Sequence, residues 1–564
     1  MPTFYSEIIA QLKNKKLSEK QFAKLKFQLS DKYKLRDVPT LIQILLHCNE
    51  KDFIKLQKIL LSKPIRSISG VAPVAIMTKP FPCPHGKCIM CPGGVDSIFG
   101  NVPQSYTGTE PATMRGIRNN FDPYLQVMNR LEQYVIQGHN AEKVELIIMG
   151  GTFPSFPLDY QEEFIKYAYK AMNDFSKLFH KKNKKSKDKE LDYLEFKQFF
   201  ELPADIEDEE RTKRLQKKLL QHKKSCKLLA EQKKNETSHI RCVALCIETR
   251  PDYGKLEQGN QMLKLGCTRV ELGIQSVYEE TLKRIQRGHT AKDTIESIRI
   301  LRDLGFKVAG HYMPGLPGLN AKKDLEGMKR LFSDSDYRPD MLKLYPCMVA
   351  KGTKLYEEYQ QGKFKPLNAD KAAKLISQFK SFVPEYCRIM RIQRDIPTKQ
   401  LAAGVEMTNL RQYLQQKYPI TCRCIRCREP KNQPISWKDV KIKVLKYEAS
   451  QGKEFFISAE DTKNDLLIGF LRLRFPSQSL RPEITSDSAL VRELHVYGTA
   501  TAIGEEGSVQ HRGWGRKLMQ KAEEIALQNG KEKMVIISGV GVREYYRRLK
   551  YKLEGPYMTK NIKK

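Results

Sequence analysis

The sequence predicts an α/β protein, built as a partial (β/α)6 barrel followed by a separate α+β domain. The first observation is a set of apolar, β-branched runs, each followed by a helical pattern, which implies parallel strands covered by helices. The second is that strand-like runs after about residue 435 follow one another closely, as in an antiparallel meander. The six expected barrel strands are residues 71–77, 144–151, 242–249, 269–276, 307–315 and 341–347.

The barrel has six strand–helix units rather than the eight of a closed barrel, so an open or partial barrel is expected. Short amphipathic helices precede it, and a linker separates it from the second domain. The expected domains are a basic helical N-terminal region (1–68), the barrel (69–380), a linker (381–435) and the α+β domain (436–564). In that last domain, a long helix from near Gln510 and a strand over 533–541 follow the meander.

A charged stretch of low complexity, about 180–236, interrupts the barrel between its second and third strands. It includes KKNKKSKDKELD and EDEERTKRLQKKLLQHKK. Such a composition favours a solvated helical hairpin or a disordered excursion. A contact with nucleic acid is the alternative.

Composition and charge bound the class of protein. The chain has 564 residues, 40% of them hydrophobic, and a formal net charge of +34. A field of that size attracts polyanions such as nucleic acid, although solvated lysine-rich helices would explain it too. Thirteen cysteines are too few for a disulfide scaffold of this length and indicate a reducing compartment. Because no apolar run approaches the ~18 residues of a membrane helix, we expect a cytoplasmic protein without a membrane partner.

Three cysteines, Cys83, Cys88 and Cys91, lie in one loop rich in proline and glycine, FPCPHGKCIMCPGG. Three thiolates can hold an iron–sulfur cluster and leave one iron open to another ligand. The alternative is a zinc knuckle with a distant fourth ligand, for which His85 is nearby. Spacing alone does not decide between the two.

The surroundings of this loop resemble the radical S-adenosylmethionine (SAM) superfamily. The loop follows the first expected strand, and the second ends in GGTF (150–153). In that superfamily the cysteines hold a [4Fe–4S] cluster whose open iron is chelated by SAM, and a Gly-Gly motif accepts hydrogen bonds from the SAM amino group. The resemblance places Gly150, Gly151 and Thr152 at that motif. The C-x4-C-x2-C spacing, and Met90 in place of the usual aromatic residue, depart from the common pattern and indicate a subfamily.

The α+β domain carries a glycine-bearing turn, QHRGWGRKLM (510–519), between a strand and a helix. Backbone N–H groups at a helix N-terminus suit a pyrophosphate, although a simple tight helix start would look the same. With the meander before it, the turn resembles the acetyl-CoA site of GNAT acetyltransferases. The residues that the resemblance assigns to this site are Gln510, His511, Arg512, Gly513, Gly515 and Arg516, with Tyr545 and Tyr546 near the thioester. Core packing would equally explain one of the two tyrosines.

A radical SAM barrel joined to a GNAT domain resembles the catalytic subunits of Elongator, which are tRNA uridine acetyltransferases. The resemblance runs through QSYTGTEPATMR (104–115), IETRPDY (247–253), RGHT (287–290), MPGLPG (313–318) and RELHVYG (492–498). It implies that SAM-derived radical chemistry and acetyl-CoA add a carboxymethyl group to C5 of uridine 34 of tRNA. It also implies a form that acts without other Elongator subunits, with a homodimer as one arrangement. Two rivals are a protein lysine acetyltransferase with a structural cluster and a tRNA-binding scaffold with degenerate sites.

The resemblance, together with strand-end positions, gives roles to further residues. Glu248 and Gln275 are expected in the SAM pocket, and Glu493 and His495 near acetyl-CoA, although a strand histidine is more often satisfied structurally. Candidates for the tRNA-facing active site are Tyr106, Lys343 and Tyr345. Their alternatives are a rim aromatic, a solvated lysine and a core tyrosine.

The linker contains a second cysteine cluster, TCRCIRCRE (421–429). Close spacing of Cys422, Cys424 and Cys427 predicts a zinc site, with Cys387 as the expected fourth ligand and a second iron–sulfur cluster as the alternative. Arg388, Arg391 and Arg394 recur every three residues and are candidates for binding tRNA phosphates. A salt-bridged helix face is their alternative.

Overall fold

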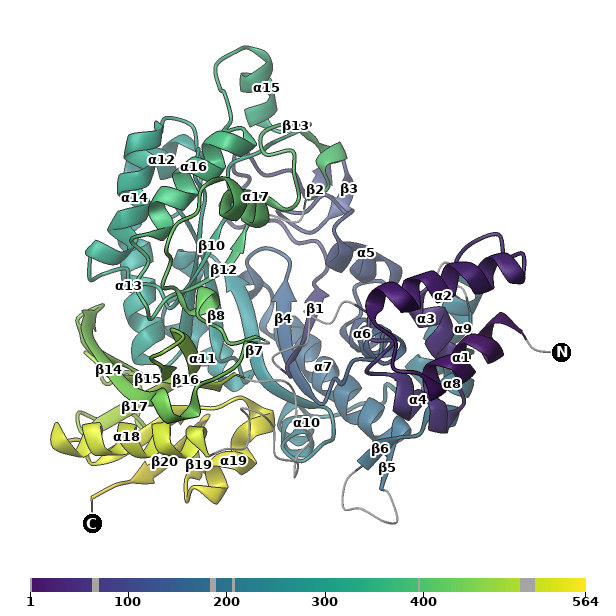
Figure 1. The fold of residues 1–564 in the computed structure, drawn as a ribbon. Helices are drawn as coiled ribbons and strands as arrows, with labels where there is room; N and C mark the ends of the chain where they lie inside the picture. The colour runs from purple at the N-terminus through teal and green to yellow at the C-terminus, as the bar shows by residue number, and fades with distance from the viewer. Residues whose placement is uncertain are drawn as a thin grey trace. The chain divides into compact units, whose positions relative to one another are not determined.

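The structure, a computed structural model, describes residues 3–62, 70–182, 189–204, 208–393, 396–431, 433–497 and 513–563 (Figure 1). These residues form two compact units. The first contains residues 1–74, 123–144 and 166–241, and the second contains residues 75–122, 145–165 and 242–564. The N-terminal region and the charged insert therefore belong to one unit, while both expected sheets lie mainly in the other.

The N-terminal region is helical, as expected. Its helices are α1 (Phe4–Asn14), α2 (Glu19–Lys32), α3 (Leu41–Leu46) and α4 (Glu50–Leu56). Thr3, Ser18 and Thr40 begin the first three helices with capping boxes, in which the side chain and the third helical residue satisfy each other's free N–H groups.

The charged insert packs more tightly than its composition suggests. Tyr193 stacks on Phe53 with ring centroids 4.0 Å apart, and its hydroxyl donates to the Leu45 carbonyl at 3.0 Å. Phe196 and Phe200 are fully buried. The described part of the insert is largely helical, as one of the two expectations had it, but it is neither disordered nor wholly solvated, because its aromatic residues supply a core of their own. Besides α1 to α4, the first unit contains α6 (Pro123–Ile136), the part of α7 (Leu158–Phe179) from residue 166, β5 (His180–Lys182), β6 (Lys189–Leu191), α8 (Tyr193–Phe199), α9 (Glu209–His222) and α10 (Leu228–Asn235).

The first large sheet contains all six expected strands and one more, in the order β1-β4-β7-β8-β9-β10-β12 (Figure 1). The neighbours from β7 to β12 pair in parallel. The strands are β1 (Ala72–Met77), β4 (Lys143–Met149), β7 (Arg241–Thr249), β8 (Arg269–Gln275), β9 (Lys307–Tyr312), β10 (Met341–Leu344) and β12 (Arg388–Ile392). The seventh, β12, comes from residues expected to be linker, so the partial barrel extends past residue 380.

Helices and two small antiparallel strand pairs accompany these strands. The helices are α5 (Pro111–Arg118), α11 (Leu256–Lys264), α12 (Glu279–Arg284), α13 (Ala291–Asp303), α14 (Ala321–Ser333), α15 (Lys354–Gln360), α16 (Ala369–Lys380) and α17 (Leu410–Lys417). Two antiparallel pairs join β2 (Gly94–Ser97) to β3 (Gly100–Val102) and β11 (Val349–Ala350) to β13 (Leu401–Ala403). Alternation of strands with helices puts the carboxyl ends of the parallel strands at one edge, where their loops can form a site.

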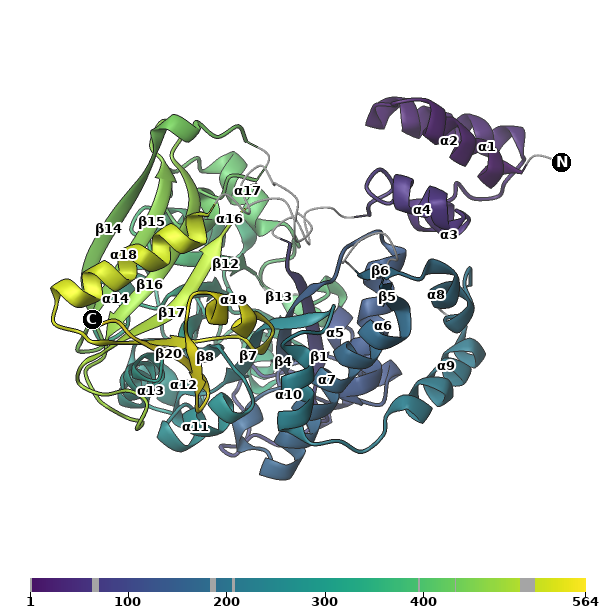
Figure 2. The same ribbon diagram turned by 90° about the horizontal axis from the view of Figure 1, so that it is seen from below.

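The second sheet is the expected C-terminal α+β domain, in the order β14-β15-β16-β17-β18-β20-β19. The four strands of the meander pair antiparallel, and β17 then pairs parallel with β18. Figure 2 shows α18 (Trp514–Gln528) across the meander, where its buried face, including Leu518 and Ala522, joins the core. The other elements are β14 (Val440–Ala449), β15 (Gly452–Asp461), β16 (Leu466–Phe475), β17 (Ser488–Val496), β18 (Lys533–Ile537), α19 (Arg543–Arg548), β19 (Lys552–Glu554) and β20 (Tyr557–Asn561).

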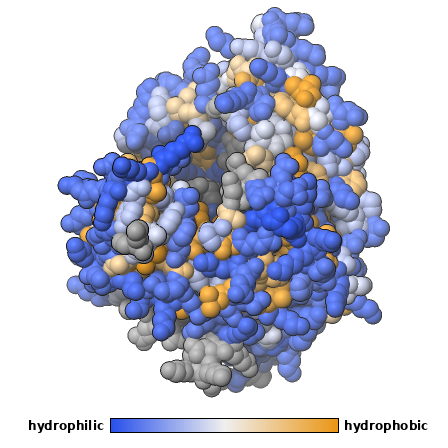
Figure 3. All heavy atoms as spheres, turned by 90° about the vertical axis from the view of Figure 1, so that its right-hand side faces the viewer, coloured by the Kyte–Doolittle hydropathy of each residue, from blue (hydrophilic) through white to orange (hydrophobic). Residues whose placement is uncertain are grey.

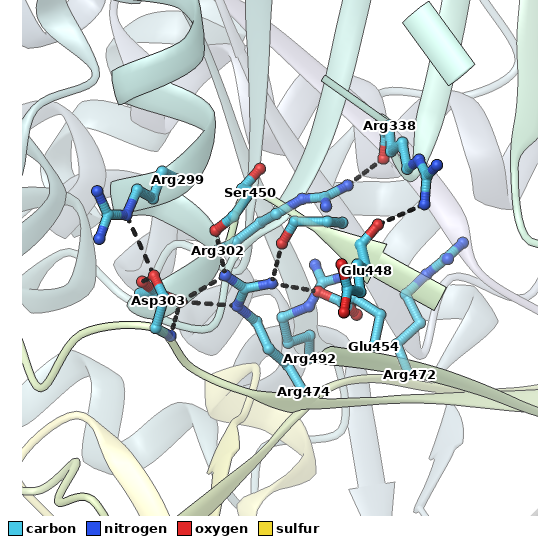
Figure 4. Close-up of polar contacts among 12 residues, drawn as sticks. Arg299, Arg302, Asp303, Arg338, Glu448, Ser450, Glu454, Arg472, Arg474 and Arg492 are labelled. Carbon is cyan, nitrogen blue, oxygen red and sulfur yellow. Dashed lines mark hydrogen bonds and ion pairs between the residues drawn. The ribbon is translucent and has the colours of Figure 1, made fainter. Parts of the chain in front are cut away.

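Buried ion pairs join the two sheets (Figure 4). Arg474, on β16, donates to Asp303 at 2.8 Å and to Glu454 at 3.0 Å. Arg492, on β17, contacts Glu454 at 2.8 Å and also reaches Asp340, just before β10. Because these arginines have no solvent exposure, their charges depend on Glu454 of the second sheet, on Asp303 at the end of α13 and on Asp340 just before β10.

Candidate active site at the ends of the parallel strands

The three-cysteine loop lies directly after β1, and its thiols are surrounded by hydrogen-bonding groups. Cys88 and Cys91 are buried. The His85 ring Nε2 lies 3.2 Å from Cys88 Sγ, and Gln104 Nε2 donates to Cys91 Sγ at 3.2 Å. Burial raises the pKa of the Cys83 thiol to about 11. Thiols held in this way need a metal centre or cations nearby to become thiolates, which is what cluster ligation requires.

The expected Gly-Gly motif lies beside this loop. Gly150 and Gly151 follow β4 with φ of 129° and 96°, a left-handed conformation that favours glycine. A Cβ on Gly150 would lie 2.0 Å from Thr78 Oγ1, so a larger residue does not fit there. The turn brings Thr152 Oγ1 to 3.8 Å from Cys83 Sγ. The structure thus unites the cysteines with Gly150, Gly151 and Thr152.

Several buried polar atoms near the thiols have no hydrogen-bond partner among the described residues. They are Arg287 Nε, Arg250 Nη1, Gln275 Oε1 and both ring nitrogens of His289. Arg287 also places Nη1 3.8 Å from Cys88 Sγ, while its Nη2 donates to the Gly273 carbonyl at 2.9 Å. Buried groups of this kind are rarely left unpaired, so the site suits a polar, anionic ligand next to the cysteines. The donor set therefore fits a cluster with a bound carboxylate.

Arg250 lies in the motif IETRPDY, and Arg287 and His289 lie in RGHT, but no role was predicted for these three residues. Burial lowers the pKa of His289 to about 2, and the neighbouring charges of Arg287 and Arg250 add to this effect. His289 is therefore neutral at physiological pH. Their position in the sequence could have predicted a role, because each motif follows a strand or a short helix at the edge that carries the cysteine loop.

A polar cluster lies inside the partial barrel, on β7, β8, β9 and β10. Glu271, 1% exposed, accepts a hydrogen bond from His311 Nε2 at 2.8 Å and forms an ion pair with Lys343. Lys343 Nζ also lies 3.6 Å from Glu248, whose other oxygen accepts from the Tyr106 hydroxyl at 3.1 Å. The structure thus brings the predicted residues Tyr106, Glu248 and Lys343 together.

Charges in this cluster fix one another's protonation. Burial alone would raise the pKa of Glu271, but Lys343 and Arg269 hold it well below its usual range. Burial alone would lower the pKa of Lys343, but Glu271 raises it. Burial and the Lys343 charge lower the pKa of His311. The stable state is therefore an anionic Glu271, a cationic Lys343 and a neutral His311.

Glu271, His311 and Arg269 were missed in the sequence, although they lie in runs recognised as strands. Polar residues inside apolar strands were the signal. Tyr345, which was predicted, lies close to them, with its ring 5.5 Å from that of His311. Arg269 forms two ion pairs, one with Glu271 at 3.1 Å and one with Glu145 at 2.7 Å. Its positive charge therefore lies between two carboxylates. Ligand atoms of Glu248, Glu271 and His311 lie within 4.8 Å of one another, and Lys343 forms ion pairs with both carboxylates.

In the C-terminal domain, the glycine turn ends where α18 begins. Gly513 precedes the helix with φ of 76°, and a Cβ on Gly515 would lie 2.8 Å from the Tyr545 hydroxyl. Arg516 is exposed, and Tyr545 is 38% exposed. Gln510, His511 and Arg512 lie outside the described residues. The structure therefore brings Tyr545 to the start of α18.

The remaining candidates of this domain take more structural positions. Tyr546 is 6% exposed and belongs to the hydrophobic core, which is the alternative given for one of the two tyrosines. Glu493 pairs with Arg472 at 2.9 Å and with Lys307 at 3.4 Å, so its carboxylate is engaged between the sheets. The ring of His495 lies beside that of Tyr497 in a tilted arrangement, with centroids 4.4 Å apart, and its Nε2 is buried without a partner among the described residues.

The linker cysteines form a compact group. The sulfurs of Cys422, Cys424 and Cys427 all lie within 4.8 Å of one another, as ligands of a single ion would. Hydrogen bonds from Cys422 and Cys427 lower the pKa of Cys424. Cys387 is fully buried and its carbonyl accepts from Ile425 N at 2.9 Å, but its thiol is not part of that group.

Two of the three candidate arginines lie on a strand rather than on a helix. Arg388 and Arg391 belong to β12, and Arg394 lies outside the described residues. Arg388 forms an ion pair with Glu429 and donates to the Tyr497 hydroxyl at 2.9 Å. A helix face is therefore wrong, because both residues lie on a strand, where a register shift pairs Arg388 with Met341 and Arg391 with Lys343. Arg391 is exposed.

The surface is mostly polar on the face drawn in Figure 3, which is the right-hand side of Figure 1. Hydrophobic side chains appear there only in scattered groups. Within the described ranges, no helix combines the length and the apolar character needed to cross a membrane.

Comparison with known families gives four matches along the chain. Residues 1–68 match the ELP3 N-terminal domain, and residues 202–331 match the radical SAM superfamily. Residues 339–418 match the radical SAM C-terminal domain, and residues 415–551 match the acetyltransferase (GNAT) family. These matches cover β7 to β12 of the first sheet and β14 to β18 of the second.

Full-length relatives are similar over nearly the whole chain. The tRNA uridine(34) acetyltransferase of Methanocaldococcus infernus is 47% identical over 537 residues, which are 93% of this chain and 92% of that protein. Elongator complex protein 3 of Homo sapiens is 38% identical, over 96% of this chain and 93% of that protein. A solved structure, the archaeal Methanocaldococcus infernus Elp3 with an N-terminal deletion (1-46), superposes with a TM-score of 0.70 at 42% identity, covering 88% of this chain and all of that one. The chain therefore belongs to the family of tRNA uridine(34) acetyltransferases and Elongator complex protein 3, with a radical SAM half-barrel and a GNAT domain.

Proposed function

We propose that this enzyme modifies uridine 34 of tRNA, using SAM-derived radical chemistry and acetyl-CoA to form 5-carboxymethyluridine. One observation supports this most strongly. The cysteine loop and the acetyltransferase sheet lie in one compact unit, and buried polar atoms near the loop have no partner among the described residues. A fully buried ion pair, Arg492 with Asp340, connects that sheet to the start of β10. A protein with two independent activities would not need such a junction.

The chemistry calls for a cofactor at the first site. C5 of uracil is not acidic and offers little to general acid–base catalysis. When bound, a [4Fe–4S] cluster and SAM supply a deoxyadenosyl radical that can take a hydrogen atom from the acetyl methyl group. Cys83, Cys88 and Cys91 would hold the cluster. Gly150, Gly151, Thr152, Glu248 and Gln275 would line the SAM pocket, and the Nε group of Arg287, which has no hydrogen-bond partner among the described residues, suits its carboxylate.

The barrel cluster would face the uridine. Lys343 stays charged between Glu248 and Glu271, so it is a fixed cation that can orient a carbonyl or a carboxylate. Tyr106 is oriented by its hydrogen bond to Glu248, and Tyr345 lies against His311. These contacts favour an active-site role for the three predicted residues over the alternatives of rim aromatic, solvated lysine and core tyrosine.

Acetyl-CoA would bind at the start of α18. Free backbone N–H groups there can receive the pyrophosphate, and Gly513, Gly515 and Arg516 lie at that end of the helix. Gln510, His511 and Arg512 precede them. Tyr545 is the better candidate to approach the thioester, because Tyr546 packs in the core. His495 would orient the thioester or a water, while Glu493 supports the strand that carries it.

The linker metal, the tRNA contacts and the domain bounds complete the proposed enzyme. Zinc would bind the compact thiol group Cys422, Cys424 and Cys427, with Cys387, whose thiol lies outside that group, as the fourth ligand expected from the sequence. Arg388, which is paired with Glu429, and exposed Arg391 both stay candidates for binding tRNA phosphates, together with Arg394. The barrel domain would run from residue 69 to β12 and the GNAT domain from 436 onward. A cytoplasmic enzyme that acts without other Elongator subunits is proposed.

An anaerobic assay with acetyl-CoA labelled with carbon-13 in its acetyl group tests this function. The reconstituted enzyme would receive reductant, SAM and bulk tRNA, and the digested nucleosides would go to mass spectrometry. We expect labelled carboxymethyluridine that disappears without SAM and in Cys88→Ala. Label found only on protein lysines, independent of SAM, would instead support the lysine acetyltransferase rival.

A further inference from the structure

The proposed reaction leaves a proton to be removed. Joining the acetyl-derived carbon to C5 of uracil forms a C–C bond while C5 still carries its hydrogen and C6 carries an unpaired electron. Restoring the C5–C6 double bond breaks the C5–H bond and releases one proton and one electron. The electron goes to a one-electron acceptor of the iron–sulfur class, and the proton needs a base.

We propose that His311, held by Glu271, is this base, an inference that rests on the proposed function. The proton passes from C5 to Nδ1 of His311 and gives an imidazolium ion beside an anionic carboxylate. His311 is then a catalytic residue and Glu271 a positioning residue. The pair has the arrangement of a histidine base oriented by a carboxylate.

Geometry fixes which ring nitrogen is free. Glu271 is anionic and can only accept hydrogen bonds, so His311 Nε2, 2.8 Å away, must donate the proton. A neutral ring then carries a lone pair on Nδ1. His311 lies one residue before the end of β9, at the edge where the carboxyl ends of the strands meet. Its side chain is 13% exposed, so the ring is largely but not fully enclosed.

The groups facing His311 leave it as the best proton acceptor of the cluster. Lys343 is directly opposite it on β10 and is already protonated. Burial raises the pKa of Tyr345, which therefore stays a neutral phenol. Glu248, on β7, is engaged by Tyr106 and Lys343. Glu271 is held anionic by Arg269 and Lys343, and it would stabilise the imidazolium ion as it forms.

Substitution of the histidine tests the proposal by product analysis. His311→Asn keeps a polar side chain without the base, Glu271→Gln weakens its orientation, and Tyr312→Phe on the same strand is the matched control. Each variant would be reconstituted with a cluster and checked for folding by circular dichroism. The assay would use acetyl-CoA deuterated in its methyl group and tRNA carrying deuterium at C5 of uridine. The measured quantities are 5′-deoxyadenosine, its deuterium content and the nucleosides.

In His311→Asn we expect 5′-deoxyadenosine to form and to carry methyl deuterium, while carboxymethyluridine falls at least tenfold. The stalled adduct would instead take up an electron and a proton, giving a dihydro product that retains the C5 deuterium. Glu271→Gln should show a smaller loss with a shifted pH profile, and Tyr312→Phe should match the wild type. The remaining carboxymethyluridine formed by His311→Asn should acquire a primary isotope effect from C5 deuterium.

Two results would overturn the assignment. If His311→Asn formed carboxymethyluridine at the wild-type rate, His311 would be excluded as the base that removes the C5 proton. Parallel loss of 5′-deoxyadenosine in both His311→Asn and Glu271→Gln would show that the pair serves SAM binding or structure instead. If the wild type itself makes no carboxymethyluridine, the proposed function has failed, and the base assignment fails with it for that separate reason.

Discussion

Arg492 and Asp340 form a bidentate ion pair with two N–H···O distances of 2.7 Å, and neither side chain is exposed to solvent. Arg492 lies on β17 of the GNAT sheet, three residues before His495. Asp340 immediately precedes β10 of the radical SAM sheet, three residues before Lys343, and it also accepts from Val308 N on β9 at 2.9 Å. The pair therefore links the strands that carry candidate groups of both sites.

Removal of the Asp340 charge should strongly destabilise the protein. Asp340→Asn leaves Arg492 and Arg472 without their shared carboxylate, and loss of one partner of a buried pair costs about 3–5 kcal/mol. The measurement is urea unfolding followed by circular dichroism. Glu532→Gln, which removes the exposed pair with Lys563, is the control and should cost about 1 kcal/mol or less. Equal effects of the two substitutions would contradict a structural role for the junction.

Acid should weaken the same junction. Burial would raise the pKa of Glu493, but Lys307 and Arg472 lower it to about 2, against 4.5 for the free group. A carboxyl with a depressed pKa stabilises the folded state above pH 4.5, and this contribution is lost as pH falls toward 2. The loss is on the order of 3 kcal/mol. Thermal unfolding measured from pH 7 to pH 3 should show a decline that is smaller in Glu493→Gln, and identical slopes would contradict it.

The Gly-Gly turn should tolerate no side chain. In Gly150→Ala the new Cβ would lie 2.0 Å from Thr78 Oγ1, so the turn beside the cysteines must shift. We expect SAM affinity of the cluster-loaded protein, measured by calorimetry, to fall at least tenfold. Gly362→Ala is the control, because its φ is also positive but nothing lies within 4 Å of the added Cβ. It should cost about 1–2 kcal/mol in stability and leave SAM affinity unchanged. Unchanged affinity in Gly150→Ala would remove this turn from the SAM site.

The linker thiols should account for bound zinc. Cys424→Ser removes one sulfur of the compact group, and we expect zinc content, measured by mass spectrometry of the purified protein, to fall well below one ion per chain. Iron bound by the reconstituted cluster should stay the same. Cys226→Ser, a substitution far from this group in sequence, should leave both metals unchanged. Zinc retained by Cys424→Ser would show that the ion binds elsewhere.

The fold was predictable where a strand buries a long apolar run, as in residues 242–249 and 269–276. The seventh strand was not, because RIMRI in β12 is short and carries two arginines. Its place is set by pairing with β10, a contact between segments distant in sequence. The packing of the charged insert was not predictable either, because its many charged residues outweigh aromatic residues such as Phe196, which is fully buried.

The candidate site divides along the same line. Cysteine spacing and the Gly-Gly motif are local patterns, and the structure unites them as expected. Glu271 and His311 look like isolated polar residues in separate strands, and only the register of β8, β9 and β10 brings them to Lys343. Arg287 reaches Cys88 across about two hundred residues of chain. Contacts between residues so far apart depend on the topology of the fold, which cannot be read from the spacing of residues along one sequence.

The most direct test of the two-site account is transfer of deuterium from the acetyl methyl group to 5′-deoxyadenosine. The wild-type enzyme would be incubated with reductant, SAM, tRNA and acetyl-CoA fully deuterated in its methyl group. The masses of 5′-deoxyadenosine and of the modified nucleoside would then be measured by mass spectrometry. The account predicts one deuterium in 5′-deoxyadenosine and two in the carboxymethyl group of uridine. Unlabelled 5′-deoxyadenosine alongside labelled nucleoside, or label confined to protein lysines, would contradict it.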